Sequence, residues 1–392
     1  MQIAKCIWDM GQLPFHVGAL PQPRDDHFPS RLPFRVGYDA ALGLVRQVHD
    51  AATEKVLSEV YGRGSQLGIP MAGHGLGKAY AGDFLDTIAA WSEGGVEGDH
   101  VLEIGCGTGH LLGALAEAGA RVAGIEPDPR CKEAMAGRGI PVATCAFEDF
   151  DAAQTWDRIV HYCVLEHVVD PVAFLRRQRD LLSRQGRIIC AVPDCGPAFE
   201  DGDISIFIHQ HWSYFAAASL RRVAAAAGLD VAAEAHARVG GLLYVSLMRA
   251  TERASEPPAE PPAEARAAQQ ADADAFVQRA RAALQRLHAY VHQTRTEGRT
   301  LGIYCPVRAI NYAPDGDEAW LSARLFDDAP QLLGRFVPPF VEPVEGGGGL
   351  EREGVDELLI MSRAFGPAIE AAVRERHPQP EPSIRHIGDL LA

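Results

Sequence analysis

Short apolar runs alternate with amphipathic helical stretches through the middle of the chain. Periodicity predicts strands, with helices between them, at 100–104, 121–125, 140–144, 157–162, 186–192, 229–234 and 242–248. Strands that alternate with helices are typical of a parallel, doubly wound α/β sheet, because each parallel crossover needs a helix. We therefore expect an α/β core over residues 91–250.

The pattern changes on both sides of this core. Residues 1–90 are rich in Pro and Gly and are expected to be irregular, with helical patterns at 48–61 and about 78–91. Past the core, a Pro/Glu/Ala segment cannot bury apolar surface and predicts a linker. A long helix over about 272–297 then leads into a second, smaller strand–helix pattern. The expected parts are an N-terminal domain at 1–90, the core at 91–250, the linker at 251–270 and a C-terminal α/β domain at 271–392.

A glycine-rich turn follows the first core strand, in Glu103-Ile-Gly-Cys-Gly-Thr-Gly109. Glycines between a strand and a helix let backbone N–H groups approach a ligand closely. Glu126 ends the next strand, where an acid can accept both ribose hydroxyl protons of an adenosine. The G-x-G-x-G spacing differs from the G-x-G-x-x-G of nicotinamide-binding Rossmann domains, which disfavours that alternative.

With Trp156-Asp-Arg-Ile-Val160 at a later strand, these motifs resemble the class I S-adenosylmethionine-dependent methyltransferases. The resemblance implies a Rossmann-like core with S-adenosylmethionine as the cofactor. The strand–helix pattern of residues 299–392 independently predicts a second, smaller Rossmann-like domain. The residues expected at the cofactor are Glu103, Gly105, Gly107, Glu126, Pro127, Phe147 and Tyr162.

Composition narrows the range of partners. The formal net charge of the 392-residue chain is −15, which argues against a nucleic-acid groove because phosphate binding needs a basic face. Its eight cysteines form no C-x-x-C pair, so neither a disulfide framework nor a zinc site is expected. No long apolar run or signal peptide is visible, and a soluble, cytoplasmic protein without membrane contact is expected. A monomer and a homodimer both stay open.

Histidines gather in two stretches that could carry chemistry. His167 follows the fourth core strand, whose end faces the methyl donor in this fold, although it could equally be a structural residue at a helix start. His209-Gln-His-Trp-Ser-Tyr-Phe215 crowds histidines and polar aromatics into one loop, which suits a substrate pocket. A neutral histidine can remove a proton near pH 7. No third ligand is apparent beside His209 and His211, so no metal is expected.

Val164-Leu-Glu-His-Val168, the His209 to Phe215 loop, and Gly302-Ile-Tyr-Cys-Pro-Val-Arg308 occur in the order that resembles the deoxysugar C-methyltransferase family. These enzymes methylate a carbon of a nucleotide-linked keto-sugar. The resemblance implies that His211 is the base that forms an enolate, that His167 is a second pocket histidine and that Tyr61 lies in the pocket.

Departures from that family put the acceptor in doubt. Only Cys6 remains where the family carries paired zinc cysteines, so the N-terminal domain is expected to lack metal. Ile208, Gln210 and Gly64 stand where polar residues are usual. The donor site is therefore intact, whereas the acceptor site has been rebuilt.

Three functions follow from these patterns. The first is C-methylation of a small-molecule acceptor of sugar or secondary metabolism, next to a ketone; the second is O- or N-methylation on the same scaffold. A third class is a binding protein that keeps the cofactor fold without turnover. An acceptor that carries a nucleotide diphosphate would need Arg308 or Arg335, since guanidinium groups suit phosphates. The residues expected to contact substrate are Tyr61, His209, Gln210, Tyr214 and Arg308.

Overall fold

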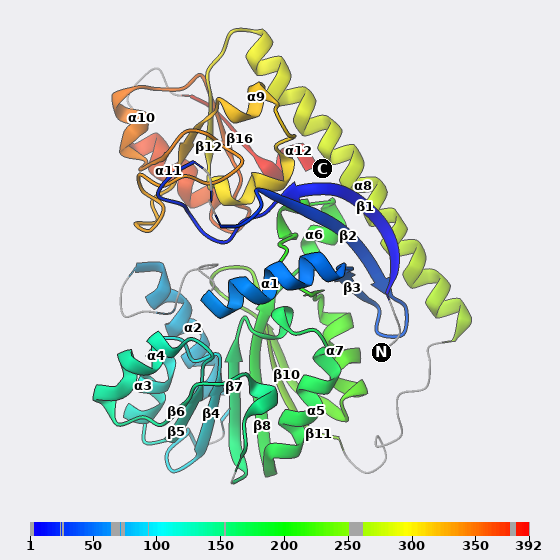
Figure 1. Ribbon diagram of the computed structural model, residues 1–392, viewed down its shortest axis with the longest axis vertical. Coiled ribbons are helices and arrows are strands. Elements are labelled where there is room, and N and C mark those ends of the chain that lie inside the picture. The colour runs from blue at the N-terminus through cyan, green and yellow to red at the C-terminus, as the bar shows by residue number, and fades with distance from the viewer. Residues whose placement is uncertain are drawn as a thin grey trace.

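Three β-sheets organise the protein in the computed structural model, which describes residues 4–23, 25, 27–63, 71, 75–92, 94–152, 154–250, 262–376 and 382–391. Figure 1 shows the central core at the bottom and the C-terminal domain at the top, with helix α1 between them and the long helix α8 along one side. Within the described residues, no helix has the length and apolar character needed to cross a bilayer.

The core sheet has the strand order β10-β11-β8-β7-β4-β5-β6. Its strands are β4 (His100–Ile104), β5 (Arg121–Ile125), β6 (Val142–Ala143), β7 (Trp156–Tyr162), β8 (Leu182–Pro193), β10 (Leu229–His236) and β11 (Leu242–Arg249). Its helices are α2 (Gly75–Ala90), α3 (His110–Glu117), α4 (Pro129–Met135), α5 (Pro171–Leu181), α6 (Gly196–Asp201) and α7 (Ala217–Ala226). Short 3₁₀ turns are η1 (Ala136–Arg138), η2 (Phe147–Asp149), η3 (Leu165–His167) and η4 (Ile204–Ile206). The expected Rossmann-like α/β core is confirmed.

One core strand departs from the all-parallel expectation. β11 pairs antiparallel with both β8 and β10. The reason is the length of the connection, since only five residues separate the end of β10 from the start of β11. A parallel crossover needs a dozen residues or more, so a connection this short can only return as a hairpin.

The N-terminal part is a sheet, and the expectation that it is irregular was wrong. Strands β1 (Lys5–Pro14), β2 (Arg31–Asp39) and β3 (Leu44–Gln47) pair antiparallel, and β9 (Ser213–Tyr214) from the core segment completes the order β1-β2-β3-β9. Pro33 obscured β2 in the sequence, because proline cannot donate to a ladder. Its position is tolerated since β3 pairs β2 only from Val36 onward. Helix α1 (Ala51–Arg63) follows this sheet.

Helix α8 (Ala263–Thr296) joins the N-terminal sheet to the C-terminal domain. It begins nine residues before the expected start, inside the expected linker, because its first turns are rich in alanine, the best helix former. Its inner face, including Phe276 and Leu287, shares one hydrophobic cluster with Phe34 of β2 and Ile303 of the C-terminal sheet. The N-terminal sheet and the C-terminal domain are thus packed through α8. Of the expected linker, 251–261 lies outside the described residues.

The C-terminal domain is a five-stranded parallel sheet in the order β14-β13-β12-β15-β16. Its strands are β12 (Leu301–Tyr304), β13 (Arg324–Phe326), β14 (Val344–Glu345), β15 (Glu357–Ile360) and β16 (Ser383–His386). Its helical segments are η6 (Pro306–Arg308), η7 (Ile310–Tyr312), α9 (Glu318–Leu321), α10 (Gly348–Arg352), α11 (Gly366–Arg376) and α12 (Ile387–Leu391). This arrangement confirms the expected second, smaller Rossmann-like domain.

Two buried histidines should make the protein sensitive to acid. Burial lowers the pKa of His16 to about 4 and that of His161 to about 3. Below pH 6.5 the unfolded chain binds protons that the folded state refuses, so the free energy of unfolding should fall between pH 6.5 and pH 4. Each histidine contributes about 3–5 kcal/mol when the effect is complete.

Urea unfolding at a series of pH values measures this loss. Neither ring nitrogen of His161 has a hydrogen-bond partner among the described residues, so His161→Leu should fold and should flatten the pH dependence. A free energy of unfolding that stays constant from pH 6.5 to pH 4 would contradict the assignment.

Candidate functional site

The glycine turn after β4 has the backbone conformation that glycine alone adopts readily. Gly105, Gly107 and Gly109 have φ angles of 73°, 50° and 74°, in the left-handed region. A Cβ on Gly109 would lie 1.6 Å from Met135 Sδ, so the turn is packed there. A Cβ on Gly107 would meet no atom within 4 Å. The turn therefore presents open space at Gly107, at the carboxyl end of the sheet where nucleotides bind in α/β folds.

Two acids border this space. Glu126 follows β5 and accepts hydrogen bonds from the amides of Gly107 (3.0 Å) and Asp128 (3.1 Å). Each carboxylate oxygen has a second lone pair, so Glu126 keeps acceptor capacity for a ribose diol. Glu103 is buried, and its Oε2 has no hydrogen-bond partner among the described residues. Burial raises the pKa of Glu103 well above its usual range. An orphaned carboxyl oxygen and an open glycine turn fit a ligand with a diol and an ammonium group.

The other residues expected at the cofactor lie around the same edge. Pro127 is exposed directly after Glu126. Tyr162 ends β7, and its hydroxyl has no partner among the described residues. The ring of Phe147 is buried and packs against Phe174, with 5.1 Å between ring centroids. The ring of Phe147 is therefore part of the hydrophobic core.

The two candidate catalytic histidines come together beside the glycine turn. The ring centroids of His167 and His211 lie 4.7 Å apart in an edge-to-face arrangement. Burial, followed by repulsion from His167, lowers the pKa of His211 well below its usual range. Burial also lowers the pKa of His167 to about 4. Both rings are therefore neutral near pH 7 and can accept protons.

Two hydrogen bonds join the two segments of the chain that carry these histidines. His167 Nδ1 donates to the carbonyl of Gln210 at 2.9 Å, and the amide of Trp212 donates to the carbonyl of Glu166 at 2.7 Å. The turn η3 after β7 and the loop before β9 are thus held in register. Glu166, which the sequence reasoning did not select, joins the pair: one ligand atom of Glu166 and one of each histidine lie within 4.8 Å of one another.

The remaining substrate candidates have structural contacts of their own. His209 is buried, faces the carbonyl of Leu32 at 3.2 Å, and packs edge-on against Phe15 and Phe34 of the N-terminal part. Its ring therefore points away from His211. Gln210 is buried and contributes its carbonyl to His167. The hydroxyl of buried Tyr214 donates to the carbonyl of Ile208 at 3.1 Å.

Tyr61 lies in helix α1, but its side chain is outside the described part of the chain. Gly64, where the family is expected to have a pocket tyrosine, also lies outside the described residues.

Arg308 reaches this edge from the C-terminal domain. It lies in η6, directly after β12, and it is exposed. Burial raises the pKa of the Tyr80 hydroxyl, and the positive charge of Arg308 partly offsets that rise. The ring of Tyr80 lies 6.5 Å from that of Tyr162 at the end of β7. Within the described ranges, no carboxylate pairs with Arg308 at 4.0 Å or less. The carboxyl ends of the two sheets thus approach each other around Arg308.

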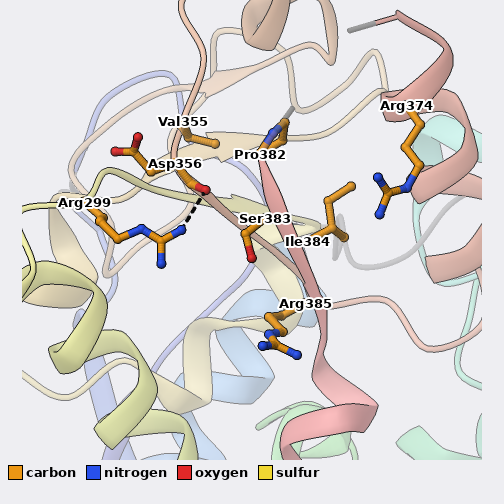
Figure 2. Close-up of a pocket in the computed structure, with 8 residues that line it drawn as sticks. All are labelled: Arg299, Val355, Asp356, Arg374, Pro382, Ser383, Ile384 and Arg385. Carbon is orange, nitrogen blue, oxygen red and sulfur yellow. Dashed lines mark hydrogen bonds between the residues drawn. The ribbon is translucent and has the colours of Figure 1, made fainter. Parts of the chain in front are cut away.

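A separate cavity of about 680 Å³ lies in the C-terminal domain (Figure 2). Apart from Arg374 of α11, its lining residues precede or lie in the first part of β12, β15 and β16, which places it at the amino ends of these strands. Ligands of parallel sheets bind at the carboxyl ends. Arg299 on its wall is already paired with Glu357 at 2.5 Å and donates to the carbonyl of Asp356. This cavity is therefore separate from the candidate site.

Comparison with known proteins finds a similarity that covers most of the core. Residues 76–234 match the family model for a methyltransferase domain. The match runs from α2 through the glycine turn and the histidine-bearing η3 into β10. This part of the chain is therefore similar to a methyltransferase domain, as the motifs of the sequence led us to expect.

Curated relatives share part of this domain. A ubiquinone biosynthesis O-methyltransferase of Cereibacter sphaeroides is 33% identical over 108 residues, which are 26% of this chain and 44% of the relative. The mitochondrial ubiquinone biosynthesis O-methyltransferase of Bos taurus is 31% identical over 118 residues, which are 27% of this chain and 32% of the relative. The chain thus spans less than half the length of these relatives.

Among solved structures, the 1,6-didemethyltoxoflavin-N1-methyltransferase of Burkholderia thailandensis is 15% identical to this chain. The match covers 56% of this chain and 96% of that one, with a TM-score of 0.41.

Proposed function

We propose that this protein transfers a methyl group from S-adenosylmethionine to a small-molecule acceptor. One observation carries the proposal: β4 and β7 are neighbours in the sheet, so the open glycine turn and the His167–His211 pair stand side by side at its carboxyl edge. Glu126 is suited to hold the ribose, and Glu103 to face the ammonium group. When bound there, S-adenosylmethionine supplies an electrophilic methyl group.

Carbon methylation next to a ketone is the leading version of this reaction. His211 would take the proton from the carbon beside the acceptor's ketone, and the resulting enolate carbon would bond to the methyl group as the methyl–sulfur bond of S-adenosylmethionine breaks and S-adenosylhomocysteine leaves. Burial keeps His211 in the free-base form. The edge-to-face contact with His167 holds the ring in position, and the hydrogen bond to Gln210 holds His167 in turn. O- or N-methylation is the second version, with His211 taking the proton of a hydroxyl or an amine.

A nucleotide diphosphate on the acceptor would be anchored by Arg308. The exposed guanidinium lacks a carboxylate partner among the described residues, so it is available for a phosphate. Guanidinium groups bind phosphate oxygens in pairs. Tyr80 and Tyr162 connect this position to the end of β7, which supports one acceptor that spans both domains.

Calorimetric titration separates these possibilities. S-Adenosylhomocysteine is titrated first, followed by a panel of nucleoside diphosphates. Binding of both supports a nucleotide-linked acceptor, whereas binding of S-adenosylhomocysteine alone supports a free small molecule. Binding of neither would refute the methyltransferase proposal. Cofactor binding without turnover of any acceptor in a broad screen would instead favour a binding protein.

Replacing Arg308 with alanine should raise the KM for a nucleotide-linked acceptor about tenfold and leave kcat unchanged. The loss corresponds to one charge-assisted contact of about 1.4 kcal/mol, made equally in the ground state and the transition state. Steady-state kinetics measure the change, and Arg352→Ala, which alters an exposed arginine of helix α10 in the same domain, is the matched control. An unchanged KM would remove Arg308 from the acceptor site.

A further inference from the structure

Proton transfer needs one base, but the candidate site brings together three possible metal ligands, Glu166, His167 and His211. One ligand atom from each lies within 4.8 Å of the other two. Two imidazoles and one carboxylate are the donor set that Zn²⁺ takes from proteins in open sites. Metal–ligand bonds of about 2.0–2.2 Å join atoms up to about 4.4 Å apart, so small side-chain rotations close the three groups around a cation.

The carboxyl group of Glu166 is an independent sign that a ligand belongs here. Glu166 is 1% exposed, and its Oε2 has no hydrogen-bond partner among the described residues. A buried carboxyl oxygen without a partner costs free energy unless a proton or a cation satisfies it. The two histidines beside Glu166 are partly exposed, so a cation can reach the cluster from the solvent.

Hydrogen bonds around the cluster orient its donors as in a metal site. His167 donates from Nδ1 to the carbonyl of Gln210, and a neutral ring that does so carries its lone pair on Nε2. A bond of this kind to a backbone carbonyl is the usual support of a metal-binding histidine. The bond between Trp212 and Glu166 fixes the segment that brings His211.

We propose that Glu166, His167 and His211 form a binding site for one divalent transition-metal cation of the Zn²⁺ kind. Three protein ligands leave at least one coordination position of such a cation open for water or another ligand. The binding of the cation is independent of the proposed function, whereas the effect of the cation on turnover rests on the proposed methyl transfer. A bound cation occupies the lone pair with which His211 takes the acceptor's proton, so loading should inhibit base-dependent methyl transfer.

Titration of the chelator-treated full chain with Co²⁺ and with Zn²⁺ tests the site without any turnover. We expect one cation per chain and a visible Co²⁺ spectrum typical of four or five ligands. Glu166→Gln and His211→Gln should each weaken binding at least tenfold. His236→Gln is the control, because His236 also faces a carboxylate, Asp194 at 3.1 Å, outside the cluster.

Several results would overturn the site. They are the absence of saturable binding by the wild-type chain, unchanged affinity in Glu166→Gln, and a thiolate-to-cobalt band that assigns the cation to a cysteine instead. The wild-type spectrum decides the question even if a variant fails to fold. Zn²⁺ binding without S-adenosylhomocysteine binding would support the cation site and refute the methyl-transfer proposal. S-Adenosylhomocysteine binding without Zn²⁺ binding would refute the cation site and leave the methyl-transfer proposal in place.

Discussion

Replacing Gly107 with leucine is expected to abolish the binding of S-adenosylhomocysteine, with a loss of about 100-fold or more in affinity, or about 3 kcal/mol. Gly107 faces open space, with no atom within 4 Å of the position a Cβ would take. A leucine side chain would fill this space and exclude the ligand. Its amide would also have to keep the bond to Glu126 in a left-handed conformation that leucine rarely adopts. Calorimetric titration measures the loss.

Gly298 offers a matched control for this experiment. It has a φ of 72°, and a Cβ there would also meet no atom within 4 Å, but it lies after the end of α8. Gly298→Leu therefore carries a similar backbone cost, about 1–2 kcal/mol, without touching the turn. Equal loss of affinity in both variants would mean that general destabilisation, and not exclusion of the ligand, explains the result. Full affinity in Gly107→Leu would remove the glycine turn from the cofactor site.

The sequence pointed to the proposed cofactor side of the site because the signals for it are local. Gly105, Gly107 and Glu126 each follow a strand directly, and parallel strands bring their carboxyl ends to one edge. The convergence of His167 and His211 depends on a fold contact over 44 positions, and the family resemblance, not periodicity, pointed to it. Glu166 was missed although it precedes His167, since nothing local indicated that its carboxyl group turns toward His211.

Other errors have equally specific causes. His209 was taken for a pocket residue because it is two positions from His211, but the chain turns there, with the amide of His211 donating to the carbonyl of Ile208 at 2.9 Å, so the two side chains do not share the face that an extended segment would give them. The N-terminal sheet, against which His209 packs, could not be recognised in the sequence. Pro33 interrupts the pattern of β2, and β9 comes from a distant segment of the chain. Neither the pairing of β3 with β9 nor the inward face of His209 has a signature within a short window of sequence.

The second large effect is expected from His211→Gln, which should lower kcat for methyl transfer by about 10²- to 10⁴-fold, the range that general bases contribute. The affinity for S-adenosylhomocysteine should stay unchanged, because the ring of His211 packs beside those of His167 and Tyr214, whereas Glu126 is held by the amides of Gly107 and Asp128. Glutamine keeps a polar side chain of similar reach but cannot take up a proton. Single-turnover assays with a nucleoside-diphosphate keto-sugar, in protein treated with a chelator, measure the chemical step directly.

Proton exchange distinguishes a base from a residue that only shapes the pocket. In deuterated water, the wild-type enzyme with S-adenosylhomocysteine should exchange the proton beside the ketone of that keto-sugar, since the proton leaves before any methyl group can move. His211→Gln should lose this exchange, and His236→Gln, which changes an exposed histidine elsewhere, should keep it. Retained exchange in His211→Gln would assign proton removal to another group. Transfer to a hydroxyl or amine acceptor without any exchange at carbon would instead select O- or N-methylation, because only the carbon reaction passes through an enolate.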